Sequence, residues 1–529
     1  MPTWKIIDRK KIDLIDDLLF QKGIDTPEQK EAFFNPKIQN YPEEISLSGI
    51  DQAKKRIEQA IKKNQTIFVY GDYDVDGVAS SAVIYHALKS LGANILPYIP
   101  HRDKEGYGLS KIGIDEIKSK GCQLLITVDH GIVAFEQVKY AKSLGLDVIL
   151  TDHHTRLDHL PEADIIIHSI NICGAGVAWC LARKLVDEVT AQKLLQFVCL
   201  GTVTDVMPLV GINRALVWEG LKELNKTDNP GLKALMLETG LNLGEISAFE
   251  IGFVLGPRIN AIGRLEHAID ALRLLCTNDL LKATKLARLL CDTNIRRQKL
   301  TTIAYEQARA MIIAEKKIYV VDSPDWVSGI IGLVAAKVSD EYSRPVIAIS
   351  RGDKFSKGSA RSINGINIVE SIRSCSDILV DVGGHSGAAG FTIETEKIEE
   401  FKKRLDDYFN EVEIVTAAES IEIAAELSNK DISRKLFNDL CMFEPFGAAN
   451  PKPIFATRRM QLEDVRAVGE GKHLKLRVDG IDGIGFGLGE WADKIMPGQK
   501  IDLAYFLDLN RFNGKEILQL RIKDLIISD

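Results

Sequence analysis

A short acidic stretch at residues 71–77, with the sequence GDYDVDG, limits the possible folds of this chain more than any other feature. The apolar residues 65–70 before it predict a buried strand, and residues 78–88 after it predict a helix. Three carboxylates therefore follow the carboxyl end of a strand, where open α/β sheets build their sites. Because like charges this close repel one another, the stretch predicts either a divalent-cation site or a solvated acidic turn.

The same arrangement recurs up to residue 168. Further strands are predicted, separated by helical segments, at residues 94–99, 122–128, 147–150 and 164–168. Asp129-His130 follows one of these strands and Asp152-His153-His154 follows another. Strands that alternate with helices are typical of a doubly wound parallel sheet. Acidic and imidazole groups placed repeatedly at strand ends indicate a site at that edge.

The candidate site residues share a position at or near the end of a strand or helix. They are Asp72, Asp74, Asp76, Asp129, Asp152, His153, His154 and Asp205. Carboxylates combined with imidazole suit a pair of divalent ions and favour Mn²⁺ over Mg²⁺. Two ions ~3.5–4 Å apart stabilise the attacking and leaving oxygens of a displacement at phosphorus. A carboxylate between the ions would bridge both, and Asp129 is the natural candidate.

Other histidines lack acidic neighbours of this kind. We expect His86, His159 and His168 to be ordinary, partly buried residues.

The second half of the chain changes its periodicity. Residues 268–314 contain neither Pro nor Gly and predict a long connecting helix, broken near residues 277–279. From residue 317, alternating strands and helices predict a second, smaller α/β domain. Gly-containing segments predict three loops, each of which carries at least one cationic or potentially cationic side chain. These segments are residues 256–265, 357–362 and 383–390.

The C-terminal part predicts a small barrel. A rigid Pro-containing linker at residues 444–453 precedes short alternating segments at residues 474–478, 483–488, 500–508 and 517–522. This pattern is typical of an OB-fold, with a plain β-sandwich as the alternative. The aromatic residues of this part could stack bases, but we expect most of them to fill the core. They are Phe486, Trp491, Tyr505, Phe506 and Phe512.

Bulk composition narrows the class of protein. A chain of 529 residues predicts three to four domains, at ~150 residues each. The net charge of −7 gives no overall sign of nucleic-acid binding but allows a local basic groove. Eight cysteines without a CxxC pair predict reduced thiols and a cytoplasmic location. The N-terminus lacks the apolar core of a signal peptide, and no apolar run approaches the ~20 residues of a membrane span.

The acidic stretch at 71–77 and the Asp-His-His triplet at 152–154 together resemble the DHH phosphoesterase superfamily and, within it, the RecJ exonucleases. The resemblance runs over nearly the whole chain. It includes EGYGL at 105–109, CGAGVA at 173–178, LGTVTD at 200–205, GPRINA at 256–261, GSARS at 358–362, GGH at 383–385 and EPFG at 444–447. Each motif is weak alone, but in this order the set is specific.

The resemblance implies an α/β fold with a doubly wound parallel-sheet DHH domain, a connecting helix, a smaller α/β DHHA1 domain and an OB-fold. We expect these at residues 46–267, 268–316, 317–411 and 412–529, after an N-terminal arm of residues 1–45. It also implies 5′→3′ removal of nucleotides from single-stranded DNA with two Mn²⁺ or Mg²⁺ ions, in DNA repair and recombination. The implied partners are single-stranded DNA, a single-strand-binding protein and a helicase, for a monomer that does not bind membranes.

The resemblance also implies roles for individual residues. The metal ligands would be Asp74, Asp76, Asp129, His153 and Asp205, with His154 as a further ligand or catalytic support and Asp129, His153 and His154 as the catalytic group. In several relatives a His stands four residues before the aspartate that matches Asp74, and this chain has Tyr70 there. We expect Asp72 to replace it as a ligand.

Basic and small residues on Gly-containing segments are the expected substrate-binding groups. They are Arg258, Asn260, Arg264, Arg361, Ser362, Gly384 and His385. An arginine can hold a phosphate with two parallel hydrogen bonds. The resemblance puts Arg361 and His385 on the substrate-binding face of the DHHA1 domain. For Arg258 and Arg264 the alternative is a salt bridge between domains.

Two other functions compete with an exonuclease. A DHH phosphodiesterase would cleave short oligonucleotides or cyclic dinucleotides, but such relatives usually lack the connecting helix and the barrel. A catalytically inactive scaffold is the second alternative, and the presence of every key carboxylate argues against it.

Overall fold

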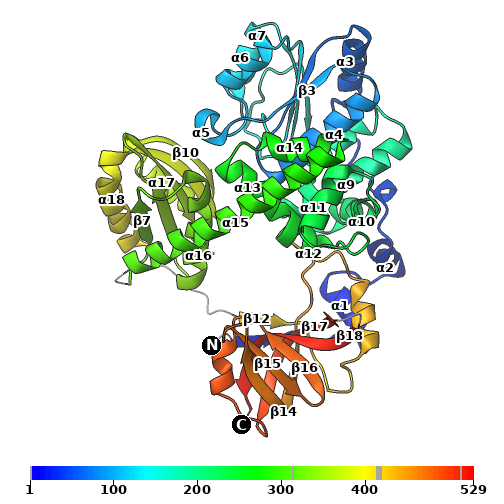
Figure 1. The fold of residues 1–529 in the computed structure, drawn as a ribbon, viewed down its shortest axis with the longest axis vertical. Coiled ribbons are helices and arrows are strands. Elements are labelled where there is room, and N and C mark those ends of the chain that lie inside the picture. The colour runs from blue at the N-terminus through cyan, green and yellow to red at the C-terminus, as the bar shows by residue number, and fades with distance from the viewer. Residues whose placement is uncertain (1–2, 313–314, 413–419, 513–514, 529) are drawn as a thin grey trace. The chain divides into compact units, whose positions relative to one another are not determined.

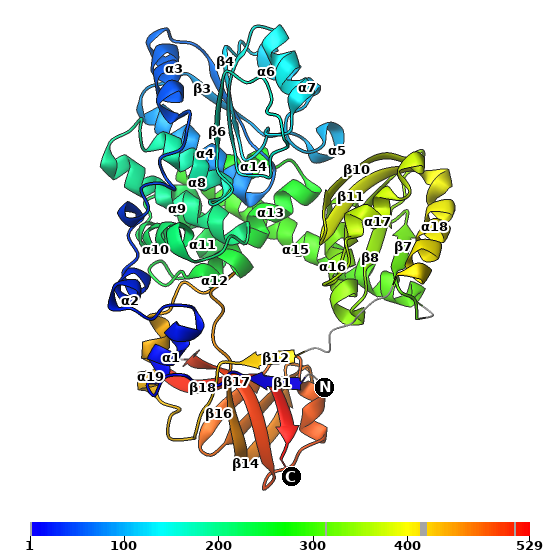
Figure 2. The same cartoon turned by 180° about the vertical axis from the view of Figure 1, so that it is seen from behind.

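The computed structural model describes residues 3–312, 315–412, 420–512 and 515–528 (Figures 1 and 2). The chain forms two compact units. The larger contains Tyr41–Met207 and Ala215–Thr416, and the smaller contains Met1–Asn40, Pro208–Arg214 and Ala417–Asp529. Within the described ranges, no helix has both the length and the apolar character needed to cross a membrane.

The larger unit begins with a five-stranded sheet in the order β3-β2-β4-β5-β6, in which every neighbouring pair is parallel. Its strands are β2 (Ile67–Tyr70), β3 (Ile95–Tyr98), β4 (Leu124–Val128), β5 (Asp147–Asp152) and β6 (Ile165–His168). This confirms the predicted doubly wound parallel sheet. The chain reverses direction across the sheet between β2 and β4, and a ligand site forms where such a switch occurs. The acidic stretch follows β2 and Asp129 follows β4, so both lie at this switch point.

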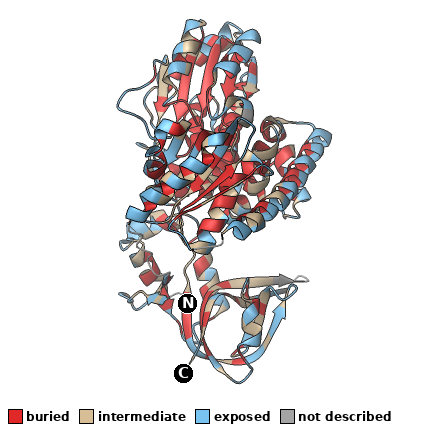
Figure 3. Ribbon diagram, turned by 90° about the vertical axis from the view of Figure 1, so that its left-hand side faces the viewer, coloured by how far each residue is buried: buried red, intermediate tan, exposed pale blue. Residues whose placement is uncertain are grey.

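Helices cover both faces of this sheet. The helices of this region are α3 (Ile50–Lys62), α4 (Val75–Ser90), α5 (Arg102–Glu105), α6 (Lys111–Ser119), α7 (Phe135–Ser143), α8 (Gly174–Ala182) and α9 (Glu188–Thr204). Helices α4 and α8 pack on one face with α9 behind them, while α6 and α7 pack on the other. Strands β2 and β4 are buried along their whole length. Figure 3 shows mainly buried strands in the sheets. Their apolar runs reflect burial on both faces.

A helical region follows the sheet. Its elements are α10 (Gly211–Asn225), α11 (Pro230–Glu238), α12 (Ala248–Glu250), the π-helix η2 (Ile251–Leu255), α13 (Gly256–Leu265), α14 (Ile269–Cys276) and α15 (Leu280–Met311). The break at residues 277–279 is confirmed. The loop predicted at 256–265 is wrong, because these residues form α13. A Pro near the first position of a helix needs no hydrogen-bond donor there, so Pro257 starts this helix rather than ending one.

The second sheet of the larger unit has the order β10-β11-β9-β8-β7. Its region contains β7 (Tyr319–Ser323), η3 (Ser328–Ile330), α16 (Ile331–Tyr342), β8 (Val346–Ser350), β9 (Phe355–Arg361), α17 (Ile368–Arg373), η4 (Ser376–Ile378), β10 (Leu379–His385), β11 (Ala388–Glu394), η5 (Thr395–Lys397) and α18 (Ile398–Glu411). The loops predicted at 357–362 and 383–390 are largely strands. Gly358 is small because the ring of Phe391 covers it, with a ring atom 2.1 Å from where a Cβ would be.

The smaller unit is a closed five-stranded barrel, in which β14-β15-β16-β18-β17 is completed by pairing of β17 with β14. Its elements are β1 (Thr3–Ile6), α1 (Leu14–Gln21), α2 (Pro27–Phe34), η1 (Ile38–Asn40), β12 (Ser420–Ile423), β13 (Ala425–Glu426), α19 (Arg434–Cys441), β14 (Phe455–Val468), β15 (His473–Val478), β16 (Ile481–Gly485), η6 (Gly489–Asp493), β17 (Lys500–Phe512) and β18 (Lys515–Ile527). The barrel, rather than the β-sandwich alternative, is therefore correct.

Two features of the smaller unit were not predicted. Strand β14, which forms one wall of the barrel, was not predicted. Its charged residues interrupt the alternation of apolar and polar residues that marks a strand. The N-terminal residues join this unit through β1, which pairs in parallel with β12. Arg214 also belongs here, where its guanidinium lies over the ring of Phe33 and donates to the carbonyls of Phe33, Phe443 and Glu444.

Candidate metal centre

The acidic stretch is held in place by the starts of two helices. Asp74 caps α4, because its side chain accepts a hydrogen bond from the Gly77 amide at 3.0 Å. Asp76 accepts from the amides of Gly174 and Ala175, at 2.6 and 2.9 Å, at the start of α8. A helix start carries free N–H groups and partial positive charge, so it orients this carboxylate.

Glycines allow α8 and α9 to approach the carboxylates closely. A Cβ at Gly174 would lie 2.5 Å from Oδ1 of Asp129, and one at Gly201 would lie 2.2 Å from Oδ1 of Asp76. These distances are too short for any side chain. The motifs at 173–178 and 200–205 therefore contain glycine because the helix backbones form walls of the site.

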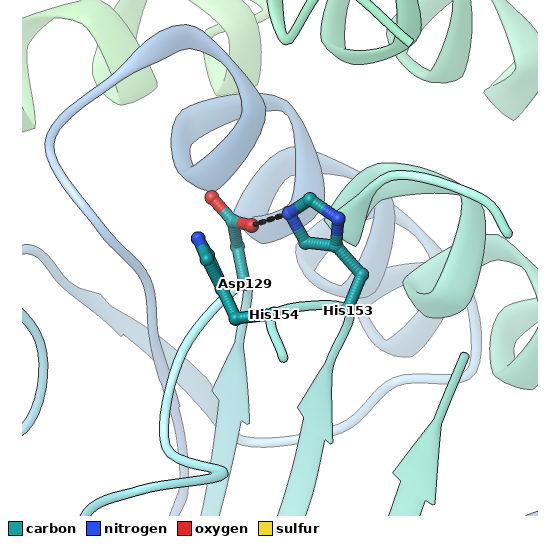
Figure 4. A group of neighbouring side chains, drawn as sticks. All are labelled: Asp129, His153 and His154. Carbon is teal, nitrogen blue, oxygen red and sulfur yellow. Dashed lines mark ion pairs between the residues drawn. The ribbon is translucent and has the colours of Figure 1, made fainter. Parts of the chain in front are cut away.

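Ligand atoms of the site lie in three groups, each within 4.8 Å: Asp72, Asp74 and Asp129; Asp76, His153 and Asp205; and Asp129, His153 and His154. Nε2 of His153 lies 3.1 Å from Oδ1 of Asp129 and 3.7 Å from Oδ2 of Asp205. Figure 4 shows Asp129 and His153 side by side with His154 next to them. Asp129 thus lies between the group of the acidic stretch and the group that contains Asp205.

The charges of Arg102 and His154 offset the negative charge of the carboxylates only in part. Burial and the neighbouring carboxylates raise the pKa of Asp72 and of Asp129 well above the usual value, and they also raise the pKa of Asp74. The same causes raise the pKa of Asp205 to about 7. Oδ1 of Asp72 and Oδ1 of Asp129 are buried and have no hydrogen-bond partner. Oxygen-rich acidic groups short of donors fit divalent cations such as Mn²⁺ or Mg²⁺.

Asp152 acts on the two histidines and belongs to none of the three ligand groups. It accepts hydrogen bonds from the amides of His153 and Ile132, and from Nδ1 of His154 at 2.8 Å. Burial alone would lower the pKa of His154, but the hydrogen bond and charge of Asp152 raise it to about 9. This pKa favours a protonated His154 in the metal-free site. Burial instead lowers the pKa of His153, which favours the neutral imidazole that binds metals.

Two residues of the site were missed by sequence reasoning. The Tyr107 hydroxyl lies 3.2 Å from Nε2 of His154 and 3.5 Å from the carbonyl oxygen of Asp129. Nε2 of His168 donates to the carbonyl oxygen of His154 at 2.7 Å, so this histidine supports the site rather than standing apart from it. The EGYGL motif at 105–109 was the available signal for Tyr107; nothing in the sequence distinguished His168.

Tyr70 does not take the place of the missing histidine. It is fully buried, its ring packs against Tyr98 and His130, and its hydroxyl lies 3.5 Å from Oγ of Ser110. Burial raises the pKa of Tyr70, so the phenol stays protonated. Asp72, with its unpartnered oxygen, remains our predicted substitute ligand.

Helix α13 brings arginines to the edge of the acidic stretch. A Cβ at Gly263 would lie 2.4 Å from the carbonyl oxygen of Tyr73, so α13 packs directly against that stretch. Burial and the charges of Arg102, Arg297 and Arg361 lower the pKa of Arg264 to about 10, and Asp74 opposes this shift. Neither Arg258 nor Arg264 takes part in an ion pair among the described residues. Arg264 instead donates to the carbonyl of Gly329 at 3.1 Å.

The predicted substrate-binding residues of the second sheet gather at one end of it. Arg361 on β9 faces Ala388 on β11, and Ala388 faces His385 on β10. The Ser362 amide donates to Gly387, whose own amide donates to Nδ1 of His385. Gly384 precedes His385 and has a φ of 138°, which favours glycine. Asn260 lies on α13, half-buried, between Arg258 and Arg264.

The barrel aromatics differ in exposure. Phe486 is 62% exposed and packs edge-on against His473. Tyr505 is fully buried, and its hydroxyl forms a hydrogen bond with the hydroxyl of Thr457. Trp491 packs against the barrel core, and Arg521 lies over the ring of Phe506. The side chain of Phe512 lies outside the described residues. Of the remaining histidines, His86 stacks on Phe197 and His159 on Phe135.

Comparison with known proteins agrees with this architecture. Family models match residues 66–202 (DHH family, N-terminal domain), 315–411 (DHHA1 domain) and 423–524 (RecJ OB domain). The single-stranded-DNA-specific exonuclease RecJ of Salmonella typhimurium is 34% identical over 527 residues, covering 90% of each chain. The chain belongs to the RecJ family.

Other members of the RecJ family extend this similarity. RecJ of Bacillus subtilis is 36% identical over 539 residues, which cover 98% of this chain and 68% of that protein. The structure of RecJ from Thermus thermophilus in complex with Mn²⁺ matches with a TM-score of 0.86 at 29% identity, over 100% of this chain and 80% of that one. The Mg²⁺ complex of the same protein matches with a TM-score of 0.81 at 28% identity, over 100% and 79%.

Proposed function

We infer that this chain is a metal-dependent exonuclease specific for single-stranded DNA, which hydrolyses phosphodiester bonds in the 5′→3′ direction. The observation that carries this proposal is the buried aspartate cluster, in which Oδ1 of Asp72 and Oδ1 of Asp129 have no hydrogen-bond partner. An arginine group, which we define as Arg258, Arg264 and Arg361, forms no ion pair among the described residues. Family membership supports it, because the relatives are named single-stranded-DNA-specific exonucleases and one was solved with Mn²⁺ and with Mg²⁺.

The ligand groups suggest how two ions would be held. Asp72, Asp74 and Asp129 would hold one ion, and Asp76, His153 and Asp205 the other, with Asp129 between them. When bound, such ions polarise the phosphate and supply hydroxide at neutral pH.

His154 and Asp152 prepare the site for an anionic substrate. Protonated His154 places a positive charge beside the carboxylates, and Asp152 fixes the orientation of its ring. The Tyr107 hydroxyl, held protonated by burial and nearby carboxylates, can donate a hydrogen bond at the same place. Both groups would orient a phosphate oxygen rather than react with it.

The arginine group would bind the phosphates of the strand. Arg264 and Arg361 repel each other in the absence of an anion, and an arginine guanidinium matches phosphate geometry. Arg258, Asn260, Ser362, Gly384 and His385 extend this polar surface. Among the described candidates in the barrel, Phe486 is the most exposed, and it could stack a base.

The remaining parts of the proposal follow the family. The catalytic domain would occupy residues 46–267, the connecting helix 268–316, the second substrate-binding domain 317–411 and the barrel 412–529, after the arm of residues 1–45. We propose a cytoplasmic monomer acting in DNA repair and recombination, with a single-strand-binding protein and a helicase as further partners. None of the eight cysteines forms a disulfide in the described part of the chain, which supports a reducing compartment.

The decisive experiment is a time course on single-stranded DNA labelled at one end or the other, with Mn²⁺ or Mg²⁺. A 5′→3′ exonuclease releases the 5′ label at once as a mononucleotide, while the 3′-labelled strand shortens progressively. Duplex DNA and an EDTA-treated reaction serve as controls. Immediate release of the 3′ label instead would refute the proposed polarity.

A dinucleotide substrate tests the competing phosphodiesterase. We expect faster turnover of the long strand, because only a longer chain offers further phosphates to the arginine group. Preference for the dinucleotide would favour the alternative. Failure to take up Mn²⁺ or Mg²⁺ in a titration would instead favour an inactive scaffold.

A further inference from the structure

An exposed pair of aromatic rings lies on the larger unit, outside the residues discussed so far. Phe249 on α12 is 51% exposed and Phe253 on the π-helix η2 is 71% exposed. Their rings stack on each other, with centroids 4.8 Å apart and an angle of 29° between planes. Single exposed apolar side chains are ordinary, but two stacked aromatic rings form a flat apolar surface that needs an explanation.

The backbone fixes this pair close to the metal centre. A Cβ at Gly252 would lie 3.7 Å from Val203, and one at Gly256 would lie 2.6 Å from Thr204. The π-helix therefore rests on the last turn of α9, which leads directly into the candidate ligand Asp205. π-Helical turns are rare and are often found at functional sites.

The next helix supplies positive charge. In Figure 1, α12 leads into α13, which carries Arg258 and Arg264. Nη1 of Arg258 donates to the carbonyl of Val254 at 2.7 Å, so this guanidinium is folded back onto the π-helix that carries Phe253. Arg297 and Arg258 also lie close enough to affect each other electrostatically. The ring pair is therefore continuous with both the metal centre and the arginines.

We propose that Phe249 and Phe253 form a base-stacking platform for the single strand, on the side of the metal centre that holds the undegraded part of the strand. Proteins that bind single strands combine stacked aromatic rings with a cationic path along the phosphates, and both parts are present here. The platform rests on the proposed function, because it assigns a role to bases beyond the bond that is cut.

Substitution of both rings tests the platform. The double variant Phe249→Ala/Phe253→Ala is compared with the wild type for binding, in EDTA, to a 3′-labelled strand of normal nucleotides and to a strand of abasic sugar phosphates. We expect the variant to lose roughly five- to 100-fold in affinity for the normal strand. Its affinity for the abasic strand should stay unchanged, because the arginines and phosphates are intact. Equal losses on both strands would refute the platform.

Two further double variants separate stacking from mere apolar contact. Trp at both positions keeps a π-face and should restore binding, whereas Leu keeps apolar surface without one and should behave as Ala does. Leu variants that bind as well as the wild type would refute stacking and favour a protein-docking surface. If thermal unfolding shows that the Ala variant is unstable, comparing the binding of the Trp and Leu double variants tests stacking in the same way.

Kinetics provide an independent readout. The Ala variant should raise KM for a long strand without changing kcat. Turnover of a dinucleotide should stay at the wild-type value, because a dinucleotide has no nucleotides beyond the two that flank the bond that is cut. Phe355→Ala, which removes a Phe that is 45% exposed on β9, is the matched control and should change neither. Reduced turnover of the dinucleotide would overturn the proposal. Binding is measured without metal, so it tests the platform independently of hydrolysis. The time course with the wild-type protein tests separately whether the chain is a nuclease.

Discussion

Asp17 and Asp129 are both buried aspartates, yet their environments are opposite. Asp17, in the smaller unit, is 0% exposed, and its carboxylate accepts hydrogen bonds from the amides of Lys10 and Lys11 and from Gln21. Burial alone would raise the pKa of Asp17, but these bonds lower it overall. Asp129, at 2% exposed, has one oxygen without a hydrogen-bond partner. Burial and the four nearby carboxylates of Asp72, Asp74, Asp76 and Asp152 raise its pKa.

The difference shows how to separate a structural acid from a functional one. Burial is the same, so burial does not decide. Hydrogen-bond donors determine the direction of the pKa shift. A buried carboxylate with several N–H partners is stabilised in its charged form, whereas one surrounded by other carboxylates is not. The second kind of site is destabilising in its charged form until protonation or a bound cation compensates the negative charge.

The largest expected effect comes from replacing Asp129. Asp129→Asn should reduce hydrolysis of single-stranded DNA by more than about 100-fold, beyond the range typical of residues that only support metal ligands. The same change should raise the Tm of the metal-free protein, because it removes one of several repelling charges. Both are measured on one preparation, by nuclease assay and thermal unfolding in EDTA. A lower Tm would mean that Asp129 is as well satisfied as Asp17.

A smaller effect is expected from the glycine wall of the site. In Gly201→Ala the new methyl would lie 2.2 Å from Oδ1 of Asp76, so the carboxylate must shift. We expect metal affinity to fall by roughly 10–100-fold, as for other changes that displace a ligand without removing it. Calorimetric Mn²⁺ titration measures this. Gly390→Ala, where the nearest atom is 3.8 Å away, is the control and should bind Mn²⁺ normally.

The opposite variant is Asp17→Asn. The Asn side chain would turn its own N–H₂ group toward N–H groups that now donate to the carboxylate. Because buried donors would then lack acceptors, we expect the smaller unit to be destabilised by about 1–3 kcal/mol. Turnover of a dinucleotide should not change, because that reaction needs only the metal centre. Denaturant unfolding provides the measurement, with exposed Asp8→Asn as the control. Unchanged stability would remove the contrast between the two acids.

The smallest effect concerns pH. The pKa of Asp205 is raised to about 7 from a usual value of 3.8, so between these values the folded metal-free chain binds more protons than the unfolded chain. Its stability should therefore fall as pH rises from 4 to 7, moderately, because the side chain is 30% exposed. Tm against pH in EDTA measures this slope. Asp205→Asn should flatten it, and an unchanged slope in that variant would assign the titration to another group.

Much of the fold was predictable because it depends on local patterns. The strands of the parallel sheet are short apolar runs, and the break at residues 277–279 is marked by polar residues with weak helix propensity. The predictions failed where glycine was taken as a sign of a loop. Gly358 lies in a strand under a ring, and Gly256 continues a π-helix into α13, so in both places glycine reflects close packing rather than chain reversal.

The sequence by itself determined that acidic and imidazole groups follow the strands of a parallel sheet, because strand periodicity is local and the carboxyl ends of parallel strands meet at one edge. Only the tertiary structure decided which carboxylates lack donors. Asp17 and Asp129 are the same residue type, but the amides that satisfy Asp17 and the carboxylates that crowd Asp129 are set by how the chain packs. The same holds for Tyr107 and His168, which reach the site through contacts with residues distant in sequence.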